Sequence, residues 1–348
     1  MKGILIIRGG AIGDFICTMP VVAALRQALP ETPLSLLSYD RVLPLAGATG
    51  SFAHLRSIER RAFAGFFAVQ KCTKIGTPLR GLRSELDKEW VEFFGSFGMI
   101  LSFLYDPDEI LADNLKRCQV KTVLTLDPRP VDRHVSEHLC SILNRVAIFP
   151  ENFSPALVLQ DAPPPVSAPG PIVLHAGSGS EKKNWSIENW RKILEFLISR
   201  DLSVTVIEGE ADARRTSQLL SGIHSPLVSV VRNEPLLQIA SVLRPARIFV
   251  GHDSGITHLA AALGTPTIAL FGPTHPHLWA PRGERTKVLW KNKVWEPKTS
   301  SPLQMEEISV DDNSPELVKA EVEEMLSALG DQRSVADGRK LRAERPLK

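Results

Sequence analysis

A regular alternation of short apolar runs and longer helical segments constrains the fold of the second half of this chain more than any other feature. Apolar runs of strand length lie at 172–175, 203–207, 227–231, 247–250 and 267–271. Helical segments lie between them at 186–200, 210–220, 234–243 and 254–263. Parallel strands are usually joined by a crossover helix, so this alternation predicts an α/β fold with a parallel sheet covered on both faces. Such sheets bind ligands at the carboxyl ends of their strands.

The first half shows the same pattern less clearly. It opens with four apolar residues at 4–7, a glycine turn at 9–13 and a helical stretch over about 14–29. Pro20 lies inside that stretch, so either the helix kinks there or a new turn begins with Thr18 as its cap. Further strand candidates lie at 34–39, 99–104 and 120–126. We therefore predict a second α/β domain.

Domain boundaries follow from a proline-rich segment. Residues 162–170 hold four prolines in nine residues, which excludes a helix or a central strand and predicts a semi-rigid linker. The predicted N-terminal domain is 1–161 and the predicted C-terminal domain is 171–312. A chain of 348 residues fits two domains, at roughly 150 residues each.

A last helix is predicted over 313–330. Pro315 suits a first helical position and Gly330 a stop. We expect its apolar stripe to pack back across the domains; the stripe consists of Leu317, Val318, Val322, Met325, Leu326 and Leu329. The remaining segment, 331–348, is charged and unpatterned, and we expect it to be disordered.

Composition excludes several classes of protein. The chain has 41 basic and 39 acidic residues, a balance that does not suit a general nucleic-acid binder. It contains no uncharged apolar run long enough for a transmembrane helix, and the run at 4–7 is too short for a signal peptide. The four cysteines form no CxxC pair, which argues against a zinc site or a disulfide framework and fits a reducing cytosol.

Three loops at predicted strand ends carry chemistry-bearing residues. The first, 8–14, has glycines that let a ligand approach the backbone, followed by Asp14 at a helix start. That carboxylate either caps the helix or faces a cleft and takes a proton from a substrate hydroxyl.

The second loop, 175–185, gathers glycines, serines and two lysines directly before a helix. It is either a solvated loop or a cradle in which amides, hydroxyls and a lysine bind phosphate.

The third loop, 251–258, has a polar turn before an apolar helix, and the amides of Ser254 and Gly255 suit a phosphate. Asp253 is either a ligand residue or the helix N-cap, and His258 is either a site residue or a hydrogen-bonded core histidine. A fourth turn, 272–274, follows the next strand and could complete the same rim.

These motifs, in this order and spacing, resemble glycosyltransferase family 9, the heptosyltransferases of lipopolysaccharide core assembly. The resemblance covers about residues 1–290 and rests on 8–14, on 175–185, and on 253–258 with 272–274. It implies a GT-B fold, with two Rossmann-like domains whose parallel sheets face an interdomain cleft. It also implies an inverting, metal-independent transfer of heptose from ADP-heptose to a lipid A-linked saccharide, in the cytoplasm.

The resemblance assigns roles by position. Asp14 would be the general base on the acceptor hydroxyl, and Lys183 would contact the donor diphosphate. Either Glu210 or Asp212 is a candidate for a contact with the ribose. The other donor-binding candidates are His175, Gly177, Ser178, Lys182, Asp253, Ser254, Gly255, His258, Gly272 and Thr274.

A basic, aromatic stretch at 55–83 suits an anionic glycolipid at a membrane face, with Arg56, Arg60, Arg61 and Arg80 as acceptor-binding candidates. The alternative is an ordinary solvated surface. This acceptor implies peripheral contact with the inner face of the bacterial inner membrane.

No cofactor or metal is expected besides the nucleotide-sugar substrate. Asp106-Pro107-Asp108 has the pattern of a metal-binding Asp-x-Asp motif, but we interpret it as a turn and cap before a helix at 109–116, because it lies off the strand ends that build the cleft.

Two rival functions remain open at the level of sequence. The first is a nicotinamide-dependent oxidoreductase, supported by the glycine turn and by Asp40 at the end of the second strand, although Arg8 stands where the dinucleotide fingerprint needs glycine. The second is a non-catalytic protein that binds a sugar nucleotide or glycolipid on the same fold.

Overall fold

The computed structural model describes residues 2–67, 86–160, 170–297 and 307–343. The chain divides into two compact units, Met1–Ala162 and Pro163–Lys348, which are treated separately below. Apart from Gly170, the described residues do not include the proline-rich segment predicted as a linker.

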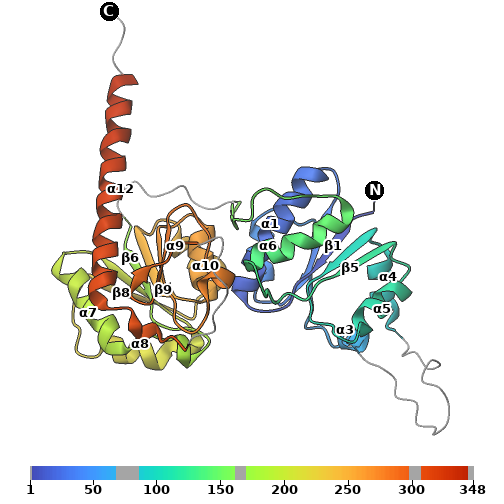
Figure 1. Ribbon diagram of the computed structural model, residues 1–348, viewed down its shortest axis with the longest axis horizontal. Coiled ribbons are helices and arrows are strands. Elements are labelled where there is room, and N and C mark those ends of the chain that lie inside the picture. Colours follow the sequence, from blue (N-terminus) through green and yellow to red (C-terminus); the bar gives the residue numbers. More distant parts are fainter. Residues whose placement is uncertain (1, 68–85, 161–169, 298–306, 344–348) are drawn as a thin grey trace, which may run out of the picture. The chain divides into compact units, whose positions relative to one another are not determined.

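The first unit contains a five-stranded, fully parallel sheet in the order β3-β2-β1-β4-β5 (Figure 1). Its strands are β1 (Ile4–Ile7), β2 (Leu34–Ser38), β3 (His54–Ser57), β4 (Met99–Ser102) and β5 (Thr122–Thr125). Its helices are α1 (Ile12–Ala28), α2 (Leu43–Ala48), α3 (Arg61–Ala64), α4 (Lys88–Gly95), α5 (Ile110–Arg117) and α6 (Val135–Cys140). The strand order reverses between β1 and β4, and such a reversal opens a crevice at the carboxyl edge of a parallel sheet.

Helix α1 is continuous through Pro20, so no new turn begins there. Its residues are buried around most of its circumference because it packs against α6 on one side and the sheet on the other. The opposite face of the sheet is covered by α4 and α5, which share an aromatic-rich core with Leu5, Ile7 and Leu37.

The second unit contains a seven-stranded sheet in the order β12-β11-β10-β9-β6-β7-β8, parallel except for β12. Its strands are β6 (Ile172–His175), β7 (Val204–Glu208), β8 (Val228–Arg232), β9 (Ile248–His252), β10 (Thr267–Leu270), β11 (Thr286–Trp290) and β12 (Lys293–Val294). Its helices are α7 (Ile187–Ser199), α8 (Ala213–Leu220), α9 (Leu236–Leu243), α10 (Gly255–Ala262), α11 (Pro276–Trp279) and α12 (Pro315–Ala343). Here the order reverses between β6 and β9.

The predicted α/β alternation is confirmed in this unit, and each predicted strand lies within two residues of an observed one. The sheet also contains β11 and β12, which the alternation did not predict because only the four-residue helix α11 lies between β10 and β11. Likewise, β3 was not predicted: its residues are polar or partly exposed, as is common for an edge strand.

Helix α12 corrects two predictions about the C-terminal region. Its apolar stripe packs on α7 and the sheet of the second unit, as Val318, Val322 and Met325 are buried there. The predicted stop at Gly330 and the predicted disorder from 331 are wrong, because the helix continues to Ala343. Each internal glycine, Gly330 and Gly338, costs a helix only about 1 kcal/mol, and no proline follows before Pro346. Residues 344–348 lie outside the described part.

Three of the four cysteines, Cys17, Cys118 and Cys140, are buried and form no disulfide bond among the described residues, and Cys72 lies outside them. Burial raises the pKa of the Cys118 thiol to about 11, against the opposing charge of Arg117.

Candidate functional site

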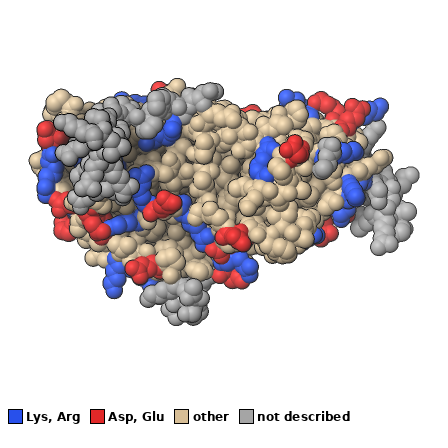
Figure 2. All heavy atoms as spheres, turned by 90° about the horizontal axis from the view of Figure 1, so that it is seen from above, with Lys and Arg blue, Asp and Glu red and all other residues tan. Residues whose placement is uncertain are grey.

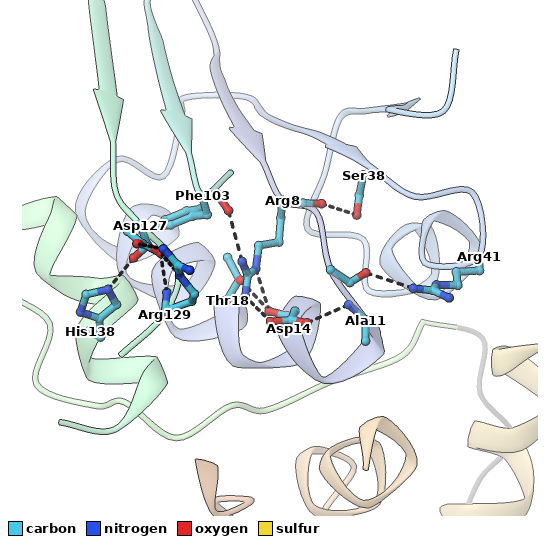
Figure 3. A network of polar contacts seen from close by, with 11 residues as sticks. Arg8, Ala11, Asp14, Thr18, Ser38, Arg41, Phe103, Asp127, Arg129 and His138 are labelled. Carbon is cyan, nitrogen blue, oxygen red and sulfur yellow. Dashed lines mark hydrogen bonds and ion pairs between the residues drawn. The ribbon is translucent and has the colours of Figure 1, made fainter. Parts of the chain in front are cut away.

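Asp14 lies at the carboxyl end of β1, in the first turn of α1, and is held by the buried side chain of Arg8 (Figure 3). Arg8 Nη2 donates to Asp14 Oδ1 at 2.6 Å, Nε donates to the Asp14 carbonyl at 3.1 Å, and Nη1 donates to the Phe103 carbonyl at 3.2 Å. Asp14 Oδ2 accepts the Ala11 amide at 2.7 Å. The carboxylate therefore caps the helix and forms an ion pair, and its side chain is still 27% exposed.

The glycine turn before α1 requires glycine at position 10. Gly10 has φ +92°, and a Cβ built there would lie 2.5 Å from Asp14 Oδ2. A side chain at this position would both strain the backbone and push the carboxylate away.

Two arginines that sequence reasoning missed follow strands of the same sheet (Figure 3). Arg41, from the loop after β2, donates to the Gly10 carbonyl at 3.2 Å. Arg129, after β5, pairs with both oxygens of Asp127 and stacks 3.9 Å from the ring of Tyr105, which is 55% exposed. Their common signal is a charged residue shortly after a strand, the same signal that singled out Asp14.

In the second unit, Lys183 and Asp253 form an ion pair across the point where the strand order reverses. Lys183 Nζ donates to Asp253 Oδ2 at 2.6 Å. Lys183 comes from the loop after β6 and Asp253 from the loop after β9, and these two strands are adjacent. Asp253 is 9% exposed, whereas Lys183 is 33% exposed.

Ser254, not Asp253, is the N-cap of α10, because its Oγ accepts the amide of Thr257. The interpretation of Asp253 as a plain cap is therefore wrong. The first intrahelical bond runs from the His258 amide to the Ser254 carbonyl. The first amides of α10 thus have no acceptor within the helix and suit an anion. His258 is buried on the same helix.

His175, at the end of β6, forms a buried pair with Asp212. Its Nε2 lies 3.1 Å from Asp212 Oδ2, and its Nδ1 is buried with no hydrogen-bond partner among the described residues. Burial raises the pKa of Asp212, but the bonds from His175 and the Gly209 amide outweigh it and leave that pKa below its ordinary value. A Cβ on Gly177 would lie 1.8 Å from Asp212 Oδ1, so the loop requires glycine there to pass over this carboxylate. Asp212 is thus committed to His175, while Glu210 is exposed.

The other donor-binding candidates lie on the same sheet edge. Ser178 Oγ donates to the Ser180 carbonyl, and Lys182 is exposed. Gly272 follows β10 and packs against the backbone of Val310, leaving no room for a Cβ, and Thr274 is half-buried.

The acceptor-binding candidates are only partly brought together. Arg56 and Arg60 line a groove of about 540 Å³ in the first unit with Phe93 and Phe97, and both pair with Glu89. Arg56 also stacks on Trp90, 3.9 Å from the ring, and its Nε is buried without a hydrogen-bond partner among the described residues. Arg61 is exposed in α3, and Arg80 lies outside the described residues.

The Asp106-Pro107-Asp108 segment is a turn and cap, as predicted. Both carboxylate oxygens of Asp106 accept amides of α5, from Leu111 at 3.2 Å and Ala112 at 2.9 Å. Among the described residues, no three His, Cys, Asp or Glu side chains gather in a way that could hold a metal ion.

Comparison with known proteins shows which family this chain is similar to. Residues 154–308 match the model of glycosyltransferase family 9 (heptosyltransferase). Lipopolysaccharide heptosyltransferase 1 of Pseudomonas aeruginosa is 40% identical over 119 residues, 34% of this chain and 32% of that protein. Lipopolysaccharide heptosyltransferase 3 of Escherichia coli is 21% identical over 310 residues, 82% of this chain and 88% of that protein.

This chain thus resembles glycosyltransferase family 9 over residues 154–308. The heptosyltransferase 1 relatives, 31–40% identical to this chain, are matched over only about a third of their own length.

Solved structures support the fold of this family 9-like chain. A family 9 glycosyltransferase from Veillonella parvula superposes with a TM-score of 0.72 at 15% identity, over 94% of this chain and 98% of the other. The E. coli heptosyltransferase WaaC with ADP superposes with a TM-score of 0.68 at 17% identity, over 92% and 99%. The predicted GT-B class, with two Rossmann-like units of parallel strands, is confirmed.

The surface of the family 9-like chain carries both signs of charge. Figure 2 shows basic and acidic side chains interspersed on the face in view, consistent with the net charge of +2. None of the described helices has the length and apolarity needed to cross a lipid bilayer.

Proposed function

We propose that this chain is an inverting glycosyltransferase that moves heptose from ADP-heptose to an anionic saccharide of the lipopolysaccharide core. The second unit binds the donor and the first binds the acceptor. The ion pair of Lys183 and Asp253 carries this proposal, because it places an accessible cation beside the α10 amides at the ligand-binding edge of the sheet.

The donor diphosphate gains negative charge as the sugar leaves. Lys183 and the first amides of α10, including those of Ser254 and Gly255, offset that charge. Since these groups can stabilise the leaving diphosphate, we propose that transfer needs no divalent metal.

The remaining groups at the carboxyl edge of the second sheet bind the rest of the donor. Ser178, Lys182, Gly272 and Thr274 line the rim. His175 offers its unpartnered Nδ1 as a hydrogen-bond partner for a hydroxyl of the donor.

Asp14 acts as general base. In the reaction, the acceptor oxygen bonds to the anomeric carbon, the bond from that carbon to the phosphate oxygen breaks, and the hydroxyl proton passes to Asp14. Arg8 fixes Asp14 through one hydrogen bond to its carboxylate and one to its backbone carbonyl, leaving an exposed fraction of the side chain to meet the substrate.

The acceptor is an anionic glycolipid met by arginines of the first unit. Arg56 and Arg60 line one groove with aromatic walls, and a saccharide with carboxylate or phosphate groups suits such a surface. With this acceptor, the reaction takes place in the cytoplasm, with peripheral contact at the inner face of the inner membrane.

A panel of nucleotide sugars with truncated core glycolipids, read by mass spectrometry in the presence of EDTA, tests the proposal. We expect a gain of one heptose with the ADP-linked donor alone. Asp14→Asn should lower transfer by about 10²–10⁴, the usual contribution of a general base, with ADP binding near the wild-type level. Transfer that is unchanged in Asp14→Asn would remove Asp14 from the mechanism.

Thermal shift separates the rival functions. Stabilisation by NADH and not by ADP would favour an oxidoreductase. Stabilisation by ADP with no transfer to any acceptor would favour a non-catalytic binding protein.

A further inference from the structure

The imidazole of His252 holds both ends of the loop that carries Lys183. His252 is fully buried at the end of β9. Its Nε2 accepts the Trp185 amide at 2.9 Å and the Trp190 Nε1–H at 3.2 Å, and its Nδ1 lies 3.3 Å from the Gly177 carbonyl. Since Nε2 faces two N–H donors, it carries no proton, and the proton on Nδ1 is donated to Gly177.

The position of this ring links it to the ion pair of the donor site. His252 directly precedes Asp253, and Trp185 comes two residues after Lys183. One side chain therefore fixes the backbone on both sides of the Lys183–Asp253 contact. Gly177 and Trp185 bracket the segment that also contains Ser178 and Lys182.

The environment keeps the ring in this one state. Complete burial lowers the pKa of His252 to about 3. The nearby His175 and Arg215 also lower this pKa, whereas the Gly177 carbonyl and Asp212 raise it. The imidazole is thus neutral throughout the physiological range.

A second side chain ties the same two ends of the loop. Arg215, in α8, donates from Nε to the Ala176 carbonyl at 3.0 Å and from Nη2 to the Trp185 carbonyl. Side chains of the second unit therefore hold both ends of the loop.

We infer that His252 is a positioning residue that presets Lys183 for the donor diphosphate. The inference rests on the proposed function, in which this loop binds the nucleotide sugar. Its physical basis is preorganisation: a loop already ordered loses less conformational entropy when an anion binds.

A double-mutant cycle on ADP binding tests the inference, with calorimetry on wild type, His252→Phe, Lys183→Ala and the double variant. His252→Phe keeps the ring volume and removes both nitrogens. We expect it to weaken ADP binding about tenfold, and Lys183→Ala to cost little more once His252 is Phe. His252→Gln places an acceptor near the Nε2 position and should restore binding to within about threefold of wild type. Additive effects of His252→Phe and Lys183→Ala would overturn the inference.

Hydrogen exchange without nucleotide keeps the inference separate from the proposed function. The Trp185 amide should exchange faster in His252→Phe than in wild type, and near the wild-type rate in His252→Gln. Equal exchange in all three proteins would overturn the inference whether or not ADP binds. Failure of wild type to bind ADP would count against the proposed donor alone.

A smaller variant covers the case in which His252→Phe does not fold. His252→Asn can still reach the Gly177 carbonyl but is too short for the Trp185 amide. It should therefore weaken ADP binding as His252→Phe does, and wild-type affinity in His252→Asn would contradict the role given to Nε2.

Discussion

Arg8 contacts both Asp14 and the carbonyl of Phe103, so one buried guanidinium joins the segments that follow β1 and β4. These are the two strands between which the first sheet reverses its order. In the second sheet, Lys183 and Asp253 join the segments after β6 and β9, where that order also reverses. Each unit therefore has an ion pair at the edge where its fold binds ligands.

Arg8→Met should lower both stability and transfer. The substitution leaves Asp14 without its cation and the buried Phe103 carbonyl without a donor, which costs about 1–3 kcal/mol of unfolding free energy. Urea denaturation measures that loss. Steady-state kinetics should show a fall in kcat with ADP affinity unchanged, because the second unit is intact.

Arg8→Lys serves as the matched control for charge. It keeps a cation near Asp14 but cannot donate to both residues in a fork. Intermediate kcat is expected, and kcat equal to wild type in both variants would show that Arg8 does not position the base.

Lys183→Met should weaken ADP binding by about 10–100-fold, or about 1.4–2.7 kcal/mol, the range of a lost charge-assisted hydrogen bond. Calorimetry with ADP and adenosine separates phosphate contact from general damage to the loop. Adenosine lacks the diphosphate, so its affinity should stay close to that for wild type. An equal loss for both ligands would contradict a direct contact of Lys183 with phosphate.

Gly10→Ala should lower transfer activity in addition to straining the backbone. Gly222→Ala is the matched control, since Gly222 also has positive φ (+74°) but has open space where a Cβ would stand. Both variants should lose roughly 1–2 kcal/mol of stability from the left-handed conformation. Only Gly10→Ala should lose transfer, because its methyl group displaces the Asp14 carboxylate.

The pH dependence of stability should report the buried imidazole of His252. Its pKa is about 3 in the folded protein against 6.5 as the ordinary value. Below about pH 6.5, His252 is protonated in the unfolded chain but stays neutral in the folded protein. The contribution of His252 to the free energy of unfolding is therefore fully present above that pH and is lost as the pH drops toward 3. The slope is about 1.4 kcal/mol per pH unit, or about 2 kcal/mol lost by pH 5.

Denaturation of wild type and His252→Gln at several pH values checks this prediction. The charged neighbours Asp212, His175 and Arg215 are common to both proteins, so their titration largely cancels in the difference. Parallel stability curves between pH 6.5 and 5 would show that the ring does titrate in the folded protein.

Much of the fold could be predicted because local pattern and final structure agree. Strands such as Ile172–His175 are short apolar runs buried on both faces, and two of the helices between the strands have serine caps, Ser186 and Ser254. The edge strand His54–Ser57 lacks that apolar signal. Helix α12 continues through Gly330 and Gly338 because each glycine costs a helix only about 1 kcal/mol.

The sequence indicated individual residues of the candidate site but not the contacts between them. Asp14, Lys183 and Asp253 each stand at a strand end, a position that sequence reveals. The contacts of His252 span 67 and 75 residues, and nothing local to His252 indicates that its ring reaches Trp185 and Gly177. Asp212 was weighed as a ribose ligand, while its contact with His175 depends on how β6 and β7 pair.

In the second unit the candidate groups gather at the carboxyl ends of the strands, which leaves the amino edge of that sheet free for engineering. The turn at 221–226 enters β8 at its amino end, and Gly222 there faces open space. A peptide tag or a surface-attachment handle inserted in this turn would sit across the full length of the strands from Lys183, so the protein could be immobilised with its reactive edge turned toward the solution.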